Sequence, residues 1–227
     1  METKLYQINE EDIQAFYREG YFVARQFLPG ESVEVINRSY DEQLESLQNE
    51  KEWQSLLMSE AAQSQLDTTR IRACMEQLLG GPTTFWHGMY AVVMPGGRGL
   101  DWHQDNQYTH ILGHMCNAFV ALDTITTDNA GLWIAPRSHL LGRLPNINPE
   151  EGHKRAAEPD NAIPGPPLEP GDALIFHREL LHHSKENRTD RPRRAFAFQV
   201  SSASSRFAET GAPVSSREDL VSGHGRG

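Results

Sequence analysis

The sequence predicts a mainly β domain, a sandwich or barrel of short strands with helices at its flank. Helical patterns with capping residues fill the chain before Pro82, whereas short apolar runs recur after it, separated by Gly, Pro, Asn and Asp. A length of 227 residues fits one compact domain. We therefore expect a single domain over residues 1–205 and a flexible tail over residues 206–227, where Ser, Gly, Arg and Glu dominate.

The segment before Pro82 is expected to contain three helices and one strand. Asn9 precedes three acidic residues, which is typical of a helix start, and Gly20 ends this first helix. The other expected elements are a strand from Tyr21 to Leu28, a helix from Ser32 to about Leu47, and a helix from about Thr68 to Leu79.

The segment after Pro82 is expected to hold the β structure. Between the strands, the stretch from Asn146 to Pro170 is rich in Pro, Glu and Asn and has little periodicity, so it predicts a long loop of the kind that often forms a lid. The expected strands are Phe85 to Met94, Asn117 to Leu122, Gly131 to Ala135, Ala173 to Phe176 and Ala195 to Val200.

Charge and apolar pattern exclude several classes of partner. A formal net charge of −10 argues against nucleic acid, whose phosphates attract clusters of Lys and Arg. No stretch approaches the roughly 20 apolar residues that cross a bilayer, and the N-terminus lacks the apolar segment of a secretory signal. We expect no membrane partner, a cytoplasmic location, and reduced thiols at Cys74 and Cys116.

His103 and Asp105 form the first candidate metal pair. Side chains alternate along an extended chain, so these two residues share a face while Gln104 points away. Taken by itself, such a pair is better explained by an aspartate that orients a surface histidine. Asp101 has the same parity and is a rival carboxylate.

A second histidine and an arginine follow a strand-like run further along the chain. His182 is the second candidate nitrogen ligand, and Arg193 stands eleven positions after it. Two histidines and one carboxylate that leave three positions open form the facial triad of non-haem Fe(II) oxygenases. O₂ and a bidentate co-substrate need those open positions, and a fixed guanidinium suits the far carboxylate of a dicarboxylate.

The sequence resembles the phytanoyl-CoA dioxygenase family of Fe(II)/2-oxoglutarate-dependent oxygenases over roughly residues 9 to 200. This resemblance implies a double-stranded β-helix, the cupin-like jelly roll. Four blocks carry it: His103-Gln104-Asp105; Asn129-Ala130-Gly131-Leu132 with Pro136-Arg137-Ser138-His139; Gly171-Asp172; and His182-x-Ser184-x-x-Asn187 with Arg193. The chain departs from the family at Ala130 and Arg137, where the family has glycine.

The resemblance also implies roles for individual residues. His103, Asp105 and His182 would bind Fe(II), and Arg193 with Ser184 would bind the C5 carboxylate of 2-oxoglutarate. Phe119 and Tyr90 would line the pocket of this co-substrate.

The implied reaction converts 2-oxoglutarate and O₂ to succinate and CO₂ while a small molecule is hydroxylated. Ascorbate is expected to stimulate it, and desaturation or ring formation would use the same site. The competing hypothesis is a non-oxidative protein on the same fold, a cupin-like isomerase or a small-molecule binding protein with Zn²⁺. Arg193 separates the two, since a zinc binder has no need of a fixed cation beside the metal.

The adjacent His182 and His183 cannot both reach one metal from an extended chain, because consecutive side chains leave on opposite faces. The spacing of the family selects His182, and it places Ser184 on the same face.

Overall fold

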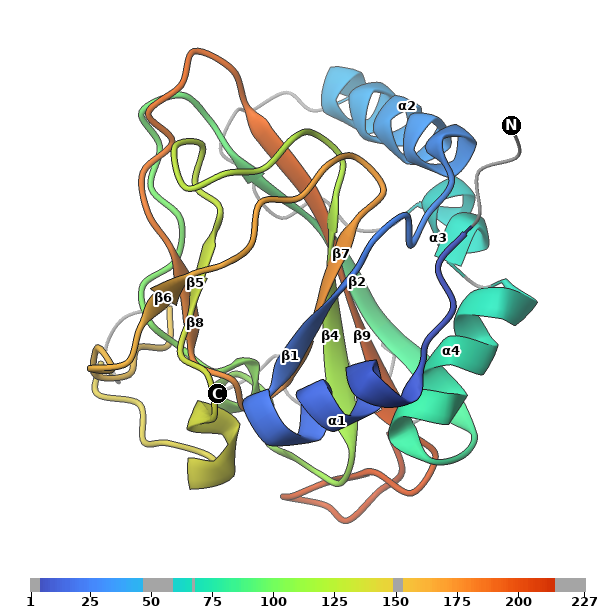
Figure 1. Ribbon diagram of the computed structural model, residues 1–227, viewed down its shortest axis with the longest axis vertical. Coiled ribbons are helices and arrows are strands. Elements are labelled where there is room, and N and C mark those ends of the chain that lie inside the picture. Colours follow the sequence, from blue (N-terminus) through green and yellow to red (C-terminus); the bar gives the residue numbers. More distant parts are fainter. Residues whose placement is uncertain (1–4, 47–58, 67, 149–152, 215–227) are drawn as a thin grey trace.

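Two antiparallel β-sheets form the centre of the computed structural model, which describes residues 5–46, 59–66, 68–148 and 153–214 (Figure 1). The larger sheet has the strand order β1-β7-β4-β9-β2 and the smaller has the order β6-β5-β8. Together they form the expected jelly roll. Their strands are β1 (Tyr21–Ala24), β2 (Thr83–Val93), β4 (Met115–Ala121), β5 (Leu132–Ile134), β6 (Ile163–Pro164), β7 (Ala173–His177), β8 (His182–Ser184) and β9 (Arg193–Ser202).

Four α-helices in the described part of the chain precede most of the strands. Asn9 and Asp12 form a reciprocal capping box at the start of the first helix, and Gly20 ends it in the left-handed conformation, as expected. Thr68 caps the last helix, also as expected. The helix over residues 60–66 was not predicted. The four are α1 (Glu10–Glu19), α2 (Gly30–Ser46), α3 (Glu60–Leu66) and α4 (Thr69–Leu79).

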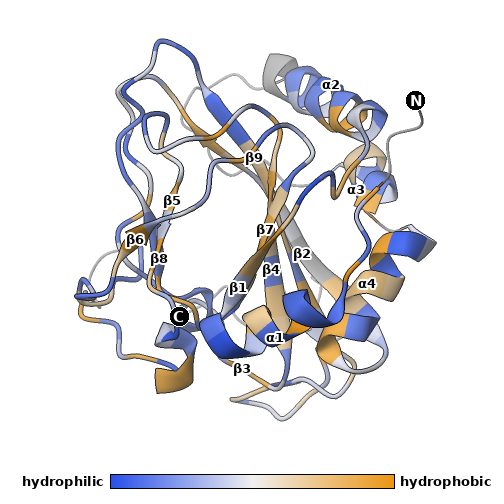
Figure 2. Cartoon of the chain, in the orientation of Figure 1, coloured by the Kyte–Doolittle hydropathy of each residue, from blue (hydrophilic) through white to orange (hydrophobic). Residues whose placement is uncertain are grey.

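The helices cover one face of the larger sheet and bury the main hydrophobic core against it. Figure 2 shows both hydrophobic and hydrophilic residues on each of these helices, as expected of elements with one buried face. Along β9, Phe196, Phe198 and Val200 belong to this core, whereas Ala195 belongs to a second cluster between the two sheets. Alternate residues of one strand therefore serve two different interiors.

The ordered chain continues beyond the expected domain boundary at residue 205. Arg206–Phe207 form β10, which pairs with β3 (Ile111–Leu112), and Val214 is buried beside them. Residues 215–227 lie outside the described chain, so the predicted flexibility of the tail stays a prediction. The long segment predicted as a loop between Asn146 and Pro170 contains the short strand β6.

Ala130 and Arg137, the two departures from the family, both have left-handed backbone, with φ angles of 63° and 68°. This conformation favours glycine, which is the residue that the family has at both positions. The chain has therefore kept the local backbone while changing the side chain, at a cost on the order of 1 kcal/mol each. Arg137 is exposed, as a surface arginine would be.

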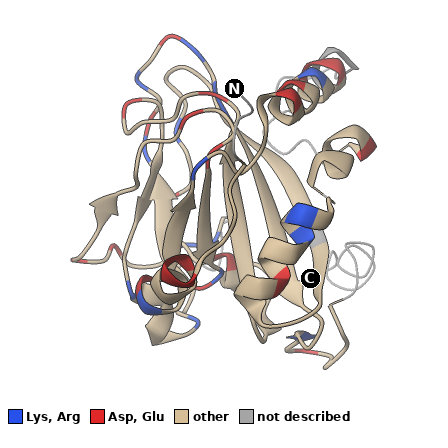
Figure 3. Cartoon of the chain, turned by 45° about the vertical axis from the view of Figure 1, so that its right-hand side comes forward, with Lys and Arg blue, Asp and Glu red and all other residues tan. Residues whose placement is uncertain are grey.

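Charged residues gather on loops and helices, whereas the strands in Figure 3 are mostly free of them. Within the described ranges, no helix has the length and apolar character needed to cross a membrane.

Candidate metal centre

His103, Asp105 and His182 converge at one point between the sheets. One ligand atom from each lies within 4.8 Å of the other two. The Nε2 atoms of His103 and His182 are 3.6 and 3.9 Å from Oδ1 of Asp105, and both imidazoles are buried. This is the donor set that the sequence predicts for iron.

Backbone pairing explains why the two histidines meet. The N–H of each donates to the carbonyl of the other, at 3.0 and 3.1 Å, so the segment before Asp105 runs antiparallel to β8. Asp105 itself opens a short 3-10 helix, η2 (Asp105–Gln107), rather than continuing a strand. Gln104 points away, as expected, and holds the neighbouring loop through the carbonyl of Gly142 and the N–H of Leu144.

The protonation states of both imidazoles suit metal binding. Nδ1 of His103 lies 2.6 Å from the carbonyl of Asp101, and Nδ1 of His182 lies 2.9 Å from the carbonyl of Leu180. A carbonyl only accepts, so the proton sits on Nδ1 and Nε2 keeps its lone pair for a metal. Burial, then the proximity of His103, lowers the pKa of His182 to about 4, which keeps it neutral.

Asp105 is held in its charged form. Burial acts to raise the pKa of Asp105, but the hydrogen bond with His103 and the proximity of His182 and Arg178 outweigh it and leave this pKa below its usual value. A deprotonated carboxylate is the state that binds a divalent cation.

Neither rival ligand points into this site. Asp101 forms an ion pair with Arg155. The ring of His183 packs 4.4 Å from that of Trp102, on the outer face of the smaller sheet. There it lines a cavity of about 730 Å³ whose wall includes Trp133 and Lys185. The parity argument for His182 over His183 therefore agrees with the geometry.

Arg193 is buried, and no acidic side chain in the described part of the chain forms an ion pair with it. Its side chain lies against Phe119, with Cζ 5.2 Å from the ring centroid, and Nη1 donates to the carbonyl of Ala91 at 3.1 Å. Nε has no hydrogen-bond partner, and within the described chain no ion pair reaches this guanidinium. Burial lowers the pKa of Arg193 to about 10, so it stays charged at neutral pH. An anion is the natural complement of such a group.

Phe119 and Tyr90, the two other residues predicted to line the co-substrate pocket, lie in different hydrophobic clusters. Phe119 belongs to the cluster between the sheets, together with Ala91 and Ala195. Tyr90 does not: it lies in the core under the helices, where its hydroxyl donates to the carbonyl of Ile36 at 3.1 Å. The expectation that Tyr90 lines the co-substrate pocket is therefore wrong, because its side chain leaves β2 on the opposite face.

Ser184 lies on β8, where it packs against Gly99. A Cβ atom at Gly99 would come within 1.6 Å of Oγ of Ser184, so only glycine fits beside it. The role predicted for Ser184 in binding a carboxylate stays a prediction.

Other residues of the family blocks brace the site. Asn187 donates to the carbonyls of Val93 and Arg191, which fixes the turn that leads to Arg193. Asp172 accepts from the backbone N–H groups of Gln26 and Glu169. These residues hold the ends of the strands that carry the site.

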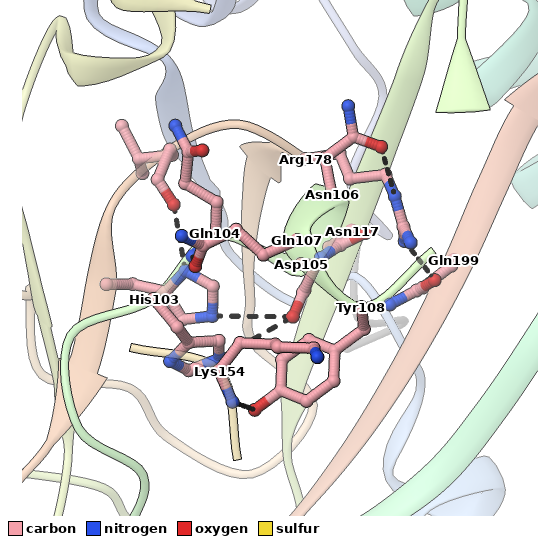
Figure 4. Close-up of polar contacts among 12 residues, drawn as sticks. His103, Gln104, Asp105, Asn106, Gln107, Tyr108, Asn117, Lys154, Arg178 and Gln199 are labelled. Atoms are coloured by element: carbon pink, nitrogen blue, oxygen red, sulfur yellow. Dashed lines mark hydrogen bonds and ion pairs between the residues drawn. The ribbon is translucent and has the colours of Figure 1, made fainter. Parts of the chain in front are cut away.

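Three polar residues beside the triad were missed in the sequence. Asn117 donates to Asp105, Arg178 donates to Asn106 in the turn behind it, and Gln199 accepts from Arg178 (Figure 4). Asn117 carried a usable signal, since it is a polar residue with the parity of Phe119 in an otherwise apolar strand. The other two carried none, because their partners lie far away in sequence.

Comparison with known proteins extends this picture. The sequence profile of the family described as phytanoyl-CoA dioxygenase matches residues 16–195. A methylphosphonate hydroxylase of Gimesia maris is 30% identical over 130 residues, which cover 55% of this chain and 48% of that protein. A phytanoyl-CoA dioxygenase domain-containing protein 1 of Bos taurus is 33% identical over 113 residues, covering 44% and 38%. The matches thus span less than half the length of these curated relatives.

Solved structures share the fold. EvdO2 from Micromonospora carbonacea var. aurantiaca superposes with a TM-score of 0.75 and 22% identity, covering 94% of this chain and 98% of that one. The epimerase SnoN, solved with Fe³⁺, alpha-ketoglutarate and nogalamycin RO, superposes with a TM-score of 0.72 and 20% identity, covering 89% and 87%. At these identities the likeness establishes the architecture.

Proposed function

This chain belongs to the phytanoyl-CoA dioxygenase family, and on that premise we propose that it is a non-haem Fe(II)- and 2-oxoglutarate-dependent dioxygenase that hydroxylates a small molecule. One observation carries the proposal. A triad of two imidazoles and one carboxylate shares the space between the sheets with a buried arginine that forms no ion pair within the described part of the chain.

The donor set fits iron. His103, Asp105 and His182 would occupy one face of an octahedron and leave three positions open. Bound Fe(II) would supply O₂ activation, which couples oxidation of 2-oxoglutarate to succinate and CO₂ with insertion of the second oxygen atom into a substrate C–H bond. Two open positions suit the chelating end of 2-oxoglutarate, and the third suits O₂.

The protein side chains would bind and orient the co-substrate. Arg193 would pair with the C5 carboxylate through parallel N–H donors, with Ser184 as the predicted second donor. Phe119 would pack along the carbon chain, since its ring already lies against the guanidinium. Burial of these groups excludes water and strengthens the ion pair.

The alternative functions differ in the cofactors and side chains that they require. Desaturation or ring formation would use the same iron and co-substrate, so either is a variant of this proposal. A cupin-like isomerase or a zinc-dependent binding protein would leave Arg193 without a purpose.

We also propose a cytoplasmic enzyme, supported by Cys74 and Cys116 being free and buried thiols. The net charge of −10 supports a small-molecule rather than a nucleic-acid partner.

The test is succinate release from 2-oxoglutarate in the presence of Fe(II), O₂ and ascorbate. We expect succinate from the wild-type chain and none from Asp105→Ala, because the variant loses the anionic ligand while the polar site tolerates the change. Circular dichroism should show that this variant is folded. Succinate formation by Asp105→Ala at the wild-type rate would remove the triad assignment, and its absence from the wild-type chain would favour the zinc-binding alternative.

A further inference from the structure

The two oxygens of Asp105 have different surroundings. Oδ1 faces the imidazoles of His103 and His182, 3.6 and 3.9 Å from their Nε2 atoms. Oδ2 points the other way and accepts a hydrogen bond from Nδ2 of Asn117 (Figure 4). One oxygen therefore faces the centre of the triad, while the other is engaged by the protein.

Asn117 is well placed to hold Oδ2. It lies in β4, at the middle of the larger sheet, where it is paired with Phe176 of β7 on one side and with Gln199 of β9 on the other. Its side chain is buried, and Oδ1 of the amide has no partner in the described chain. A carboxylate only accepts, so the amide must present its nitrogen to Asp105. The burial of an unpartnered acceptor is the cost of this orientation.

Arg178 fixes the turn that carries Asp105. Its Nε donates to Oδ1 of Asn106, the next residue, at 3.3 Å, and Nη2 donates to the carbonyl of Thr109 at 3.1 Å. Nη1 donates to Oε1 of Gln199, which is the neighbour of Asn117 across the sheet. The guanidinium is buried and thus ties η2, and the segment that follows it, to the larger sheet.

We propose that Asn117 is a positioning residue that keeps Asp105 a one-oxygen ligand of the metal, with Arg178 holding the turn in register. This inference rests on the proposed function. A carboxylate binds a metal through one oxygen or through both. A second oxygen from Asp105 would take one of the three positions that 2-oxoglutarate and O₂ need. Engaging Oδ2 elsewhere prevents this.

The test separates metal binding from co-substrate binding. Asn117→Leu removes the amide but keeps the branched shape of the side chain, and the half-buried Asn37, on the helix side of the sheet, gives the matched control Asn37→Leu. Each protein is loaded with Co(II) without O₂, and its d–d absorption, which reports the kind and arrangement of the metal's ligands, is followed as 2-oxoglutarate is added. Metal affinity is measured by calorimetry.

We expect Asn117→Leu to bind Co(II) within a few-fold of the wild-type affinity, with a changed d–d spectrum, because the second oxygen of Asp105 replaces a solvent ligand. Its affinity for 2-oxoglutarate should fall by about 10–100-fold, the usual effect of losing a partner of a metal ligand. Asn37→Leu should match the wild type. If Asn117→Leu does not fold, Asn117→Ser replaces it, since its hydroxyl is too short to reach Asp105.

Two results would overturn the inference: an Asn117→Leu protein whose spectrum and 2-oxoglutarate affinity match those of the wild type, or one that no longer binds Co(II). Both require that wild-type protein bind Co(II) and 2-oxoglutarate together. If the wild type binds no 2-oxoglutarate, the proposed function itself has failed.

Discussion

Neighbouring residues of one strand face two different interiors in this protein, and β9 shows the contrast in two consecutive arginines. Arg194 faces the helices and bonds to both carboxylate oxygens of Asp123, at 2.8 and 3.0 Å. Arg193 faces the space between the sheets, where it contacts a carbonyl and an aromatic ring. Arg194 has its counterion within the chain, whereas Nε of Arg193 has no hydrogen-bond partner in the described part of the chain.

The same contrast recurs in β8. His183 packs on Trp102 at the outer face, whereas His182 directs Nε2 toward Asp105 and His103. Burial by itself does not distinguish a functional side chain, because both faces of the larger sheet are buried. A buried side chain is better recognised as functional when its hydrogen-bond donors or acceptors have no partner in the described chain.

Replacing His182 and His183 by alanine, one at a time, should give the largest difference in bound iron and turnover between the two faces of β8. We expect His182→Ala to purify without iron and to form no succinate, because the site has lost one of three ligands. His183→Ala should keep both properties at a reduced level, since loss of a partner outside the coordination sphere costs about 10–100-fold. Bound iron and turnover are measured in each variant. Metal retained by His182→Ala and lost by His183→Ala would mean that the wrong histidine was chosen.

Replacing Arg193 or Arg194 by alanine should give a smaller difference, which we expect in the affinity for 2-oxoglutarate. Arg193→Ala is expected to weaken 2-oxoglutarate binding by about 1.5–3 kcal/mol, or roughly tenfold to a hundredfold, the usual contribution of a hydrogen bond to a charged group. Arg194→Ala should change this affinity little, because its partner Asp123 lies on the other face. The KM for 2-oxoglutarate checks both variants. The reverse ranking would show that the strand register is wrong by one residue.

Local signals in the sequence were sufficient for three of the four described helices and for the choice of candidate metal ligands. The caps at Asn9 and Gly20 act within a few residues, so their outcome can be read from the sequence. The candidate triad could be chosen because parity within two short segments, and the spacing that the family resemblance supplies, select its residues. Asn117 stands out as a polar residue in an apolar strand, but its partner and those of Arg178 lie in distant segments and could not be read from the sequence.

Tyr90 shows a different limit of prediction from sequence, which concerns the face of the sheet on which a side chain lies. Both faces of β2 are buried in apolar clusters, so alternation of apolar and polar residues cannot tell which face a side chain occupies. A register shift between Phe85 and His87 also interrupts the regular pairing of this strand with β9. The face of Tyr90 was therefore fixed by tertiary packing against Phe196 and Tyr40 rather than by its own sequence.

Tyr90→Phe gives the smallest expected effect and the sharpest check of the face on which this residue lies. The variant keeps the ring that packs on Phe196 and loses the hydrogen bond from the hydroxyl to the carbonyl of Ile36. We expect the free energy of unfolding in urea to fall by about 0.5–1.5 kcal/mol, with more if the buried carbonyl stays unpaired. Affinity for 2-oxoglutarate should not change, because the hydroxyl lies under the helices.

Phe119→Ala is the control from the inner face, and it should weaken 2-oxoglutarate binding, since the ring supports Arg193. A Tyr90→Phe protein of unchanged stability that binds 2-oxoglutarate less well would place this side chain back in the pocket.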